Sequence, residues 1–215
     1  MSLVNPFNPN NPFDIQGQRH MDITTSVDQQ NRDQILGIQG AAPRESFVTS
    51  AVRNTAQQMY GLGDDPMQYF TRIPGYQGLV SGVDFKGNYR NIILGFPGIS
   101  DNTKQQFVAL FDSLVNLPLQ TEDDVNNAIN RIIAFENQVA AAGNGEESLF
   151  SGLSVAKYSI YGWWKLPPYN PFPPFDPVPA LKINWGSVIC DGLGACAGGL
   201  VGAAAGSACY WYCTN

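Results

Sequence analysis

Apolar residues recur at steps of three and four along the middle of the chain, and this spacing is typical of amphipathic helices. Four segments carry the pattern, at about 45–60, 101–117, 121–142 and 146–164. The linkers between them are short, which favours antiparallel neighbours. The sequence therefore predicts a mainly α fold with an antiparallel helical body at 45–166.

Capping residues support three of these helix ends. Thr121 opens the third segment with Asp124 three residues later, the spacing of a capping box, and Gly143 follows its last apolar residue. Asp101 is predicted to cap the second segment, and Gly61 to stop the first.

The first 44 residues lack long apolar stripes. Proline recurs from Asn5 to Phe13, which predicts an extended arm. The stretch from Asp14 to Ile38 is polar with few apolar points, so we expect short, shallowly buried helices there. An N-terminal arm with short helices is thus predicted for 1–44.

Glycine and proline punctuate two further stretches. At 62–100 they leave the local structure open, with a hairpin from Val83 to Leu94 as one candidate. Seven prolines lie between Pro167 and Pro179, and this density is typical of a semi-rigid extended spacer. The sequence therefore predicts a spacer at 167–180 and a separate glycine-rich tail at 181–215, folded as a single helix or as a hairpin.

Four glycines of the tail, which we call the glycine zipper, recur every fourth residue: Gly194, Gly198, Gly202 and Gly206. On a helix they would form one stripe that allows a second helix to approach closely. Each interior glycine costs a helix roughly 1 kcal/mol relative to alanine. The tail therefore needs support from lipid, from other helices of the chain or from a second copy.

Membrane association through 187–213 stays open. No charged residue lies between Gly192 and Thr214, a span close to the roughly 20 residues that a bilayer requires. Against insertion, Leu193, Leu200 and Val201 are the tail's only strong aliphatics beyond Gly192. The first twenty residues carry neither a basic start nor an apolar run, so no Sec signal peptide is predicted.

All four cysteines lie in the tail: Cys190, Cys196, Cys209 and Cys213. If the tail folds back near Gly202, nested disulfides could join the outer two and the inner two. Buried free thiols are the favoured alternative, because the sequence indicates no oxidising compartment. The spacing fits no zinc finger or ribbon, and no metal or other cofactor is expected.

Charge narrows the range of partners. Only 14% of the residues are charged, and 12 basic against 18 acidic residues give a net charge of −6. No basic cluster could neutralise several phosphates in a row, so nucleic acid is not expected to bind.

The single histidine offers the one catalytic alternative. A hydrolase or other enzyme could use His20 with Asp14 or Asp22, but no nucleophile motif such as Gly-x-Ser-x-Gly accompanies it. A structural histidine at a helix start is the favoured interpretation.

Short islands near both ends of the chain resemble a group of uncharacterised bacterial helical proteins. In that group an Asn-Pro-aromatic-acidic start precedes a Gly-x-x-His step, and a glycine-zipper tail ends the chain. The matching islands are residues 11–20, residues 154–159 with Trp163 and Trp164, and Asp191 with the tail. The resemblance implies a helical body and tail but no activity, and Met21 departs from the polar residue expected after the histidine.

The leading hypothesis is a non-enzymatic helical interaction protein whose tail associates with a membrane or with other helices, including those of a second copy. Because the tail also resembles glycine-rich, cysteine-bearing bacteriocins, a bacteriocin-like secreted effector is an alternative.

Overall fold

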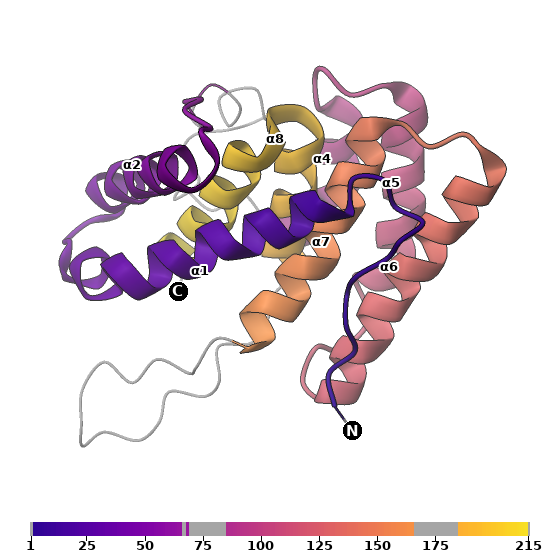
Figure 1. Cartoon of the computed structure of the whole chain (residues 1–215), viewed down its shortest axis with the longest axis horizontal. Coiled ribbons are helices and arrows are strands. Elements are labelled where there is room, and N and C mark those ends of the chain that lie inside the picture. Colours follow the sequence, from indigo (N-terminus) through magenta and orange to yellow (C-terminus); the bar gives the residue numbers. More distant parts are fainter. Residues whose placement is uncertain (1, 66–67, 69–84, 166–184, 215) are drawn as a thin grey trace.

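The computed structural model describes residues 2–65, 68, 85–165 and 185–214, which form helices and no strand (Figure 1). The predicted mainly α fold is confirmed. The predicted spacer at 167–180 lies outside the described residues. The helices are α1 (Asp14–Gly37), α2 (Ala41–Tyr60), α4 (Phe85–Gly95), α5 (Asp101–Leu114), α6 (Glu122–Ala142), α7 (Glu147–Lys165) and α8 (Trp185–Thr214).

The predicted ends of α6 are confirmed. The Thr121 hydroxyl accepts a hydrogen bond from the Asp124 backbone N–H at 3.1 Å, and the Asp124 carboxylate accepts one from the Thr121 N–H at 2.9 Å. Gly143 ends the helix in the left-handed conformation with φ 64°. For α5 the predicted cap is off by one residue, because the side chain of Ser100 accepts from the Thr103 N–H.

A single helix of 24 residues replaces the short, shallow helices predicted after the arm. Ile23, Val27 and Ile35 of α1 are fully buried. The same helix also buries Asp14 and His20. Because polar groups share its inward face, the helix shows a weak apolar stripe although it packs deeply against α2, α7 and α8.

Helix α4 replaces the hairpin considered at 83–94. Its Ile92 and Ile93 are buried, and Phe96 follows at the helix end, also buried. Tyr89 packs at the edge of the same cluster, three and four residues before the two isoleucines. This spacing places the three side chains on one face of a helix, whereas a strand would need apolar residues at alternate positions.

Helix α8 is folded back on itself instead of standing apart as a tail. Gly199, with φ 63° and ψ −162°, breaks the helix into two legs, 185–198 and 200–214. The hairpin of these legs, called the α8 hairpin below, packs against α1, α2, α4 and α7, and most extensively against α7. In Figure 1 it lies behind α1, between α2 and α7. The prediction of a tail separate from the body is therefore corrected.

Burial explains why the hairpin belongs to the body. Its small residues let the two legs and α7 come close, and its apolar residues join the main core cluster. The buried apolar positions include Val188, Ile189, Leu193, Val201, Ala204, Ala205 and Ala208. Within the part of the chain that the structure describes, no helix has the length and apolarity needed to span a membrane.

The N-terminal arm is ordered against the body. It runs along α6 and α7 to the start of α1 (Figure 1), and Val4 N–H donates to the Asn126 side chain of α6 at 2.7 Å. The arm thereby brings residues from the start of the chain beside helices more than a hundred residues away.

Candidate functional site

The four zipper glycines do not share one continuous stripe. Because Gly199 breaks α8, Gly194 and Gly198 lie on the first leg and Gly202 and Gly206 on the second. Gly194 supports a close contact between the legs, since a Cβ there would stand 2.8 Å from the Cα of Ala203.

The described cysteines are thiols. Cys190 and Cys209 are buried, Cys196 is half-buried, and none of the three forms a disulfide. Burial raises the pKa of Cys190 and Cys196. The hairpin turns at Gly199, earlier than assumed, so the predicted pairing of Cys196 with Cys209 is out of register. The side chain of Cys213 lies outside the described residues.

His20 is a core residue. It is 1% exposed, and burial lowers the pKa of its imidazole to about 4, against a smaller opposing effect of the Ala203 backbone. Asp22 accepts instead from the Tyr60 hydroxyl at 2.8 Å, and Asp14 faces Lys157. The structure therefore does not assemble the histidine–aspartate pair of the enzyme hypothesis.

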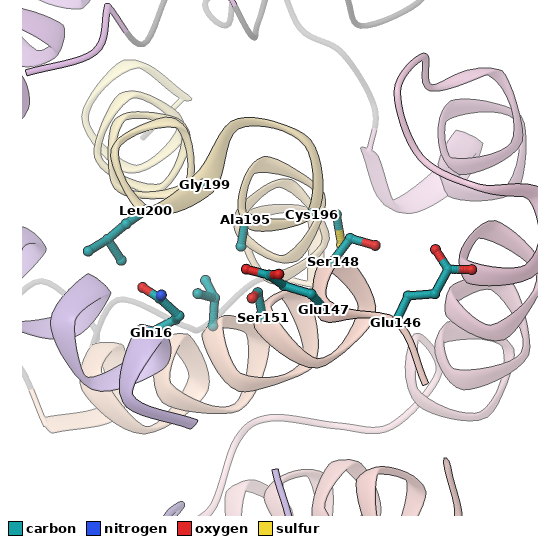
Figure 2. Close-up of a pocket in the computed structure, with 10 residues that line it drawn as sticks. Gln16, Glu146, Glu147, Ser148, Ser151, Ala195, Cys196, Gly199 and Leu200 are labelled. Carbon is teal, nitrogen blue, oxygen red and sulfur yellow. The ribbon is translucent and has the colours of Figure 1, made fainter. Parts of the chain in front are cut away.

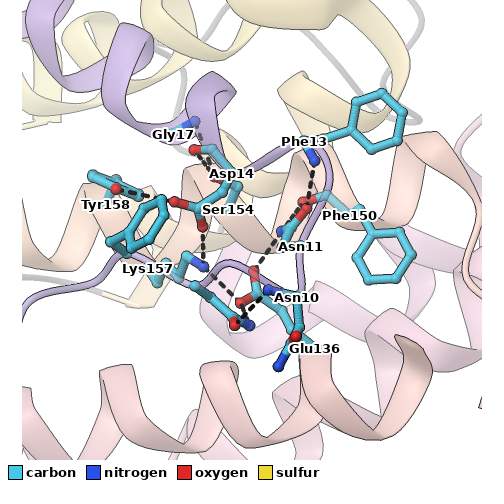
Figure 3. Close-up of polar contacts among 12 residues, drawn as sticks. Asn10, Asn11, Phe13, Asp14, Gly17, Glu136, Phe150, Ser154, Lys157 and Tyr158 are labelled. Atoms are coloured by element: carbon cyan, nitrogen blue, oxygen red, sulfur yellow. Dashed lines mark hydrogen bonds and ion pairs between the residues drawn. The ribbon is translucent and has the colours of Figure 1, made fainter. Parts of the chain in front are cut away.

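Lys157 is the centre of a buried charged cluster (Figure 3). Its Nζ is fully buried, in ion-pair contact with Asp14 Oδ1 and 2.6 Å from Glu136 Oε2. The Tyr158 hydroxyl donates to Asp14 Oδ2 at 3.1 Å. Burial raises the pKa of Glu136, and the neighbouring Lys157 opposes that shift.

Two asparagines of the arm complete this cluster. Asn8 Nδ2 donates to Glu136 Oε2 at 2.8 Å, and Asn11 Nδ2 donates to Glu136 Oε1 at 2.6 Å and to the Phe150 carbonyl at 2.9 Å. Asn11 Oδ1 accepts from the Phe13 N–H. The side-chain amides of Asn8 and Asn11 thus anchor the arm to α6 and α7 at the buried charged cluster.

Glu136 and Lys157 were not predicted as site residues, although the sequence carries a signal for them. Glu136 lies four residues after Ile132 and three before Val139, inside the apolar stripe of α6. Lys157 lies at the same kind of position in α7. Opposite charges on the buried faces of two helices predict a buried pair, because a single buried charge is costly.

A second buried polar group surrounds Asp191 of α8. Its Oδ2 accepts from the Ser159 hydroxyl and, at 2.9 Å, from the Ser207 hydroxyl, and Trp163 Nε1 donates to Ser207 at 3.1 Å. Burial raises the pKa of Asp191 to about 7, against the opposing effect of these hydrogen bonds.

The islands at residues 11–20, residues 154–159 and Asp191 meet in these two clusters. Ser154 donates its hydroxyl to the Asp14 carbonyl at 2.7 Å and accepts from the Gly17 N–H at 3.0 Å. A Cβ on Gly17 would stand 2.5 Å from the Ser154 carbonyl oxygen. Together with the Ser159–Asp191 contact, these interactions join α1, α7 and α8, so the island residues hold the fold together.

A pocket of about 470 Å³ opens beside the turn of the α8 hairpin (Figure 2). Glu147, Ser148 and Ser151 of α7 face Ala195 and Cys196 of α8 in this view. The other lining residues are Gln16, Glu146, Val155, Gly199 and Leu200.

The polar side chains that line the pocket differ in hydrogen bonding and in exposure. Glu146 accepts from the Ser100 hydroxyl at 2.6 Å, and this bond lowers its pKa. Ser151 is 9% exposed and contributes to the lining. Glu147 lies exposed at the rim. The pocket therefore combines carboxylate and hydroxyl groups with an apolar wall.

No protein-family model, curated protein or solved structure matches this chain. Among the described residues, no three histidine, cysteine or acidic side chains are grouped as a metal site would need.

Proposed function

We propose that the protein is a non-enzymatic helical binding protein that takes a small aliphatic amine in the pocket beside Gly199. The observation that carries the proposal is a pocket whose charged lining residues are both acidic, with hydroxyl groups and an apolar wall beside them. The volume falls within the range of small-molecule sites.

The lining suits an amine in both its parts. An ammonium group carries three donors and no acceptor, and the Glu147 carboxylate, the Ser151 hydroxyl and the Gln16 amide oxygen can accept them. Val155, Ala195 and Leu200 form the apolar wall that a short methylene chain would cover. An anionic ligand would meet two carboxylates, so the charge selects against it.

The tail-mediated interaction favoured by the sequence makes a different demand on the fold. To enter a membrane or to pair with other helices, the α8 hairpin would have to leave the body. The same requirement holds if the protein is a member of the bacterial group or a bacteriocin-like effector. That step would expose the buried Asp191 and the apolar core around it. The turn at Gly199 is accessible without such unfolding.

The enzyme alternative meets a similar obstacle. A general base must reach the proton that it removes, and His20 is buried between helices with a depressed pKa. Binding at the hairpin turn needs no such rearrangement.

Calorimetric titration of the full chain with putrescine tests the proposal, and butyrate provides the probe of opposite charge. We expect saturable binding of putrescine and none of butyrate. Glu147→Gln should weaken binding by roughly tenfold or more, the loss expected for one charge-assisted hydrogen bond. Asp33→Asn removes one exposed carboxylate of α1, outside the pocket, and is the matched control.

The outcome is decided by the difference between the two variants. Equal weakening by Glu147→Gln and Asp33→Asn would mean that the chain's overall negative charge attracts the amine, and would contradict a site. Absence of saturable putrescine binding to the native chain would contradict the proposal directly.

A further inference from the structure

Lys157 stands in an energetically costly environment. Its side chain and that of Glu136 are fully buried, and that of Asp14 is 6% exposed. Removing three ionisable groups from water is expensive even when they pair, and two carboxylates against one ammonium leave an excess negative charge. Any reaction that removes a pair of these charges would relieve this cost.

We propose that Lys157 and Asp14 become joined by an intramolecular amide bond between Nζ and Cγ. In the structure the two reacting groups are in contact. The Lys157 Nζ is in ion-pair contact with Asp14 Oδ1, on the carboxyl carbon that it would attack. This inference is independent of the proposed amine binding, because none of these residues lines the pocket.

The surrounding residues supply each proton transfer that the condensation needs. The Lys157 ammonium gives one proton to Asp14 Oδ1, which leaves a neutral amine and a carboxylic acid. The amine attacks Cγ while the Tyr158 hydroxyl, 3.1 Å from Oδ2, stabilises the developing oxyanion. Glu136 Oε2, 2.6 Å from Nζ, takes the second proton and returns it to the departing Oδ1 hydroxyl. One water leaves, and no other reactant is consumed.

The proximity of the amine and the carboxyl group and the burial of both favour formation of the amide bond. The fold holds amine and carboxyl together, which replaces a bimolecular encounter by an intramolecular one. The product amide is neutral, whereas the reactants are a buried ion pair, and the site excludes the water that would hydrolyse the bond. Asn8 and Asn11 keep Glu136 in place as the proton carrier.

The bond would tie the first turn of α1 to the middle of α7. The chain between residues 14 and 157 would then be a closed loop that denaturants cannot open, with the loop-closure entropy removed from the unfolded state. The arm and the helical body would be one covalent unit.

Intact-mass spectrometry of the reduced, denatured full-length chain tests the proposal. The expected mass is lower than that of the amino-acid sequence by one water molecule. Proteolytic mapping should yield a branched peptide that contains both Asp14 and Lys157. Lys165→Met, which removes an exposed lysine of the same helix, should retain the loss of water and serves as the control.

Two results would overturn the proposal. The full sequence mass in the native chain would show a permanent ion pair, and a water loss mapped to another residue pair would show a different reaction. Lys157→Met should restore the full mass, and Glu136→Gln should leave most of the chain unlinked. The native chain decides the question even if a variant fails to fold.

Discussion

Gly194 and Ala203 face each other across the α8 hairpin so closely that a Cβ on Gly194 would stand 2.8 Å from the Ala203 Cα and 3.0 Å from its backbone nitrogen. Backbone atoms cannot move aside as the end of a flexible side chain can. The glycine is therefore a requirement of the hairpin, and the hairpin in turn fills the centre of the helical body.

Gly194→Ala should destabilise the protein. The added methyl group forces the legs apart, and overpacking of this kind costs about 1–3 kcal/mol in the free energy of unfolding. Urea unfolding followed by circular dichroism measures the change. Gly37→Ala is the matched control, because nothing lies within 4 Å of a Cβ at that helical glycine. A loss no larger at Gly194 than at Gly37 would contradict the close packing of the legs.

Asn11 should matter far more than its neighbour Asn10. The Asn11 amide binds both Glu136 and the Phe150 carbonyl in a buried site, so Asn11→Ala leaves buried groups without partners and should cost about 2–3 kcal/mol. Asn10 bonds Asn137 at the exposed surface, and Asn10→Ala should stay within about 0.5 kcal/mol. Thermal unfolding of both variants checks this, and equal effects would argue against the arm as an anchored element.

Asp191 should make the folded state less stable as pH rises. Its pKa is about 7 in the folded state against the ordinary value of 3.8, so between these values the folded protein holds a proton that the unfolded chain has lost. This difference amounts to roughly 4 kcal/mol over the whole window. Asp191→Asn removes the effect. Its stability relative to the native chain should therefore rise from about pH 4.5 to pH 8 in urea unfolding, and a constant difference would contradict the buried carboxylate.

His20 should have the opposite effect. Its pKa falls from 6.5 to about 4 on folding, so the unfolded chain binds a proton that the folded state refuses, and stability is lost as pH falls through this window. The loss approaches roughly 3 kcal/mol below the lower value. His20→Leu should abolish this contribution, visible as a smaller drop in unfolding midpoint between about pH 7 and pH 4.5 than in the native chain. An unchanged drop would mean that His20 is not buried as a neutral ring.

The two groups offset each other in the native chain. Between about pH 4 and 6.5, acidification lowers the stability of the folded state through His20 and raises it through Asp191. Each single variant therefore exposes the contribution of the other residue.

Local rules in the sequence predicted the helical body well. The capping box at Thr121 and the glycine stop at Gly143 act within one turn of chain, so no tertiary information is needed to recognise them. The missed positions depend on distant partners. Asp14 and His20 made α1 look like a solvent-exposed segment, because the α7 and α8 groups that receive them cannot be read from α1 itself.

The tail shows the same limit at a larger scale. Its glycine and alanine spacing predicted a need for close helix neighbours, but the sequence does not distinguish among lipid, a second copy and the chain's own helices as those neighbours. Gly199 turns the helix back along the body by its conformation, which the sequence does not distinguish from that of Gly198. The pocket depends on this turn, and so it could not be anticipated.

Native-state hydrogen exchange of the full chain tests most directly whether the α8 hairpin is part of the body. We predict that backbone amides of both legs, including those of Ile189, Leu193, Ala204 and Ala208, exchange only through global unfolding, with the same opening free energy as the α7 core around Ala156. Exchange of both legs at a much lower opening free energy, while α7 stays protected, would show a separable tail and contradict the account.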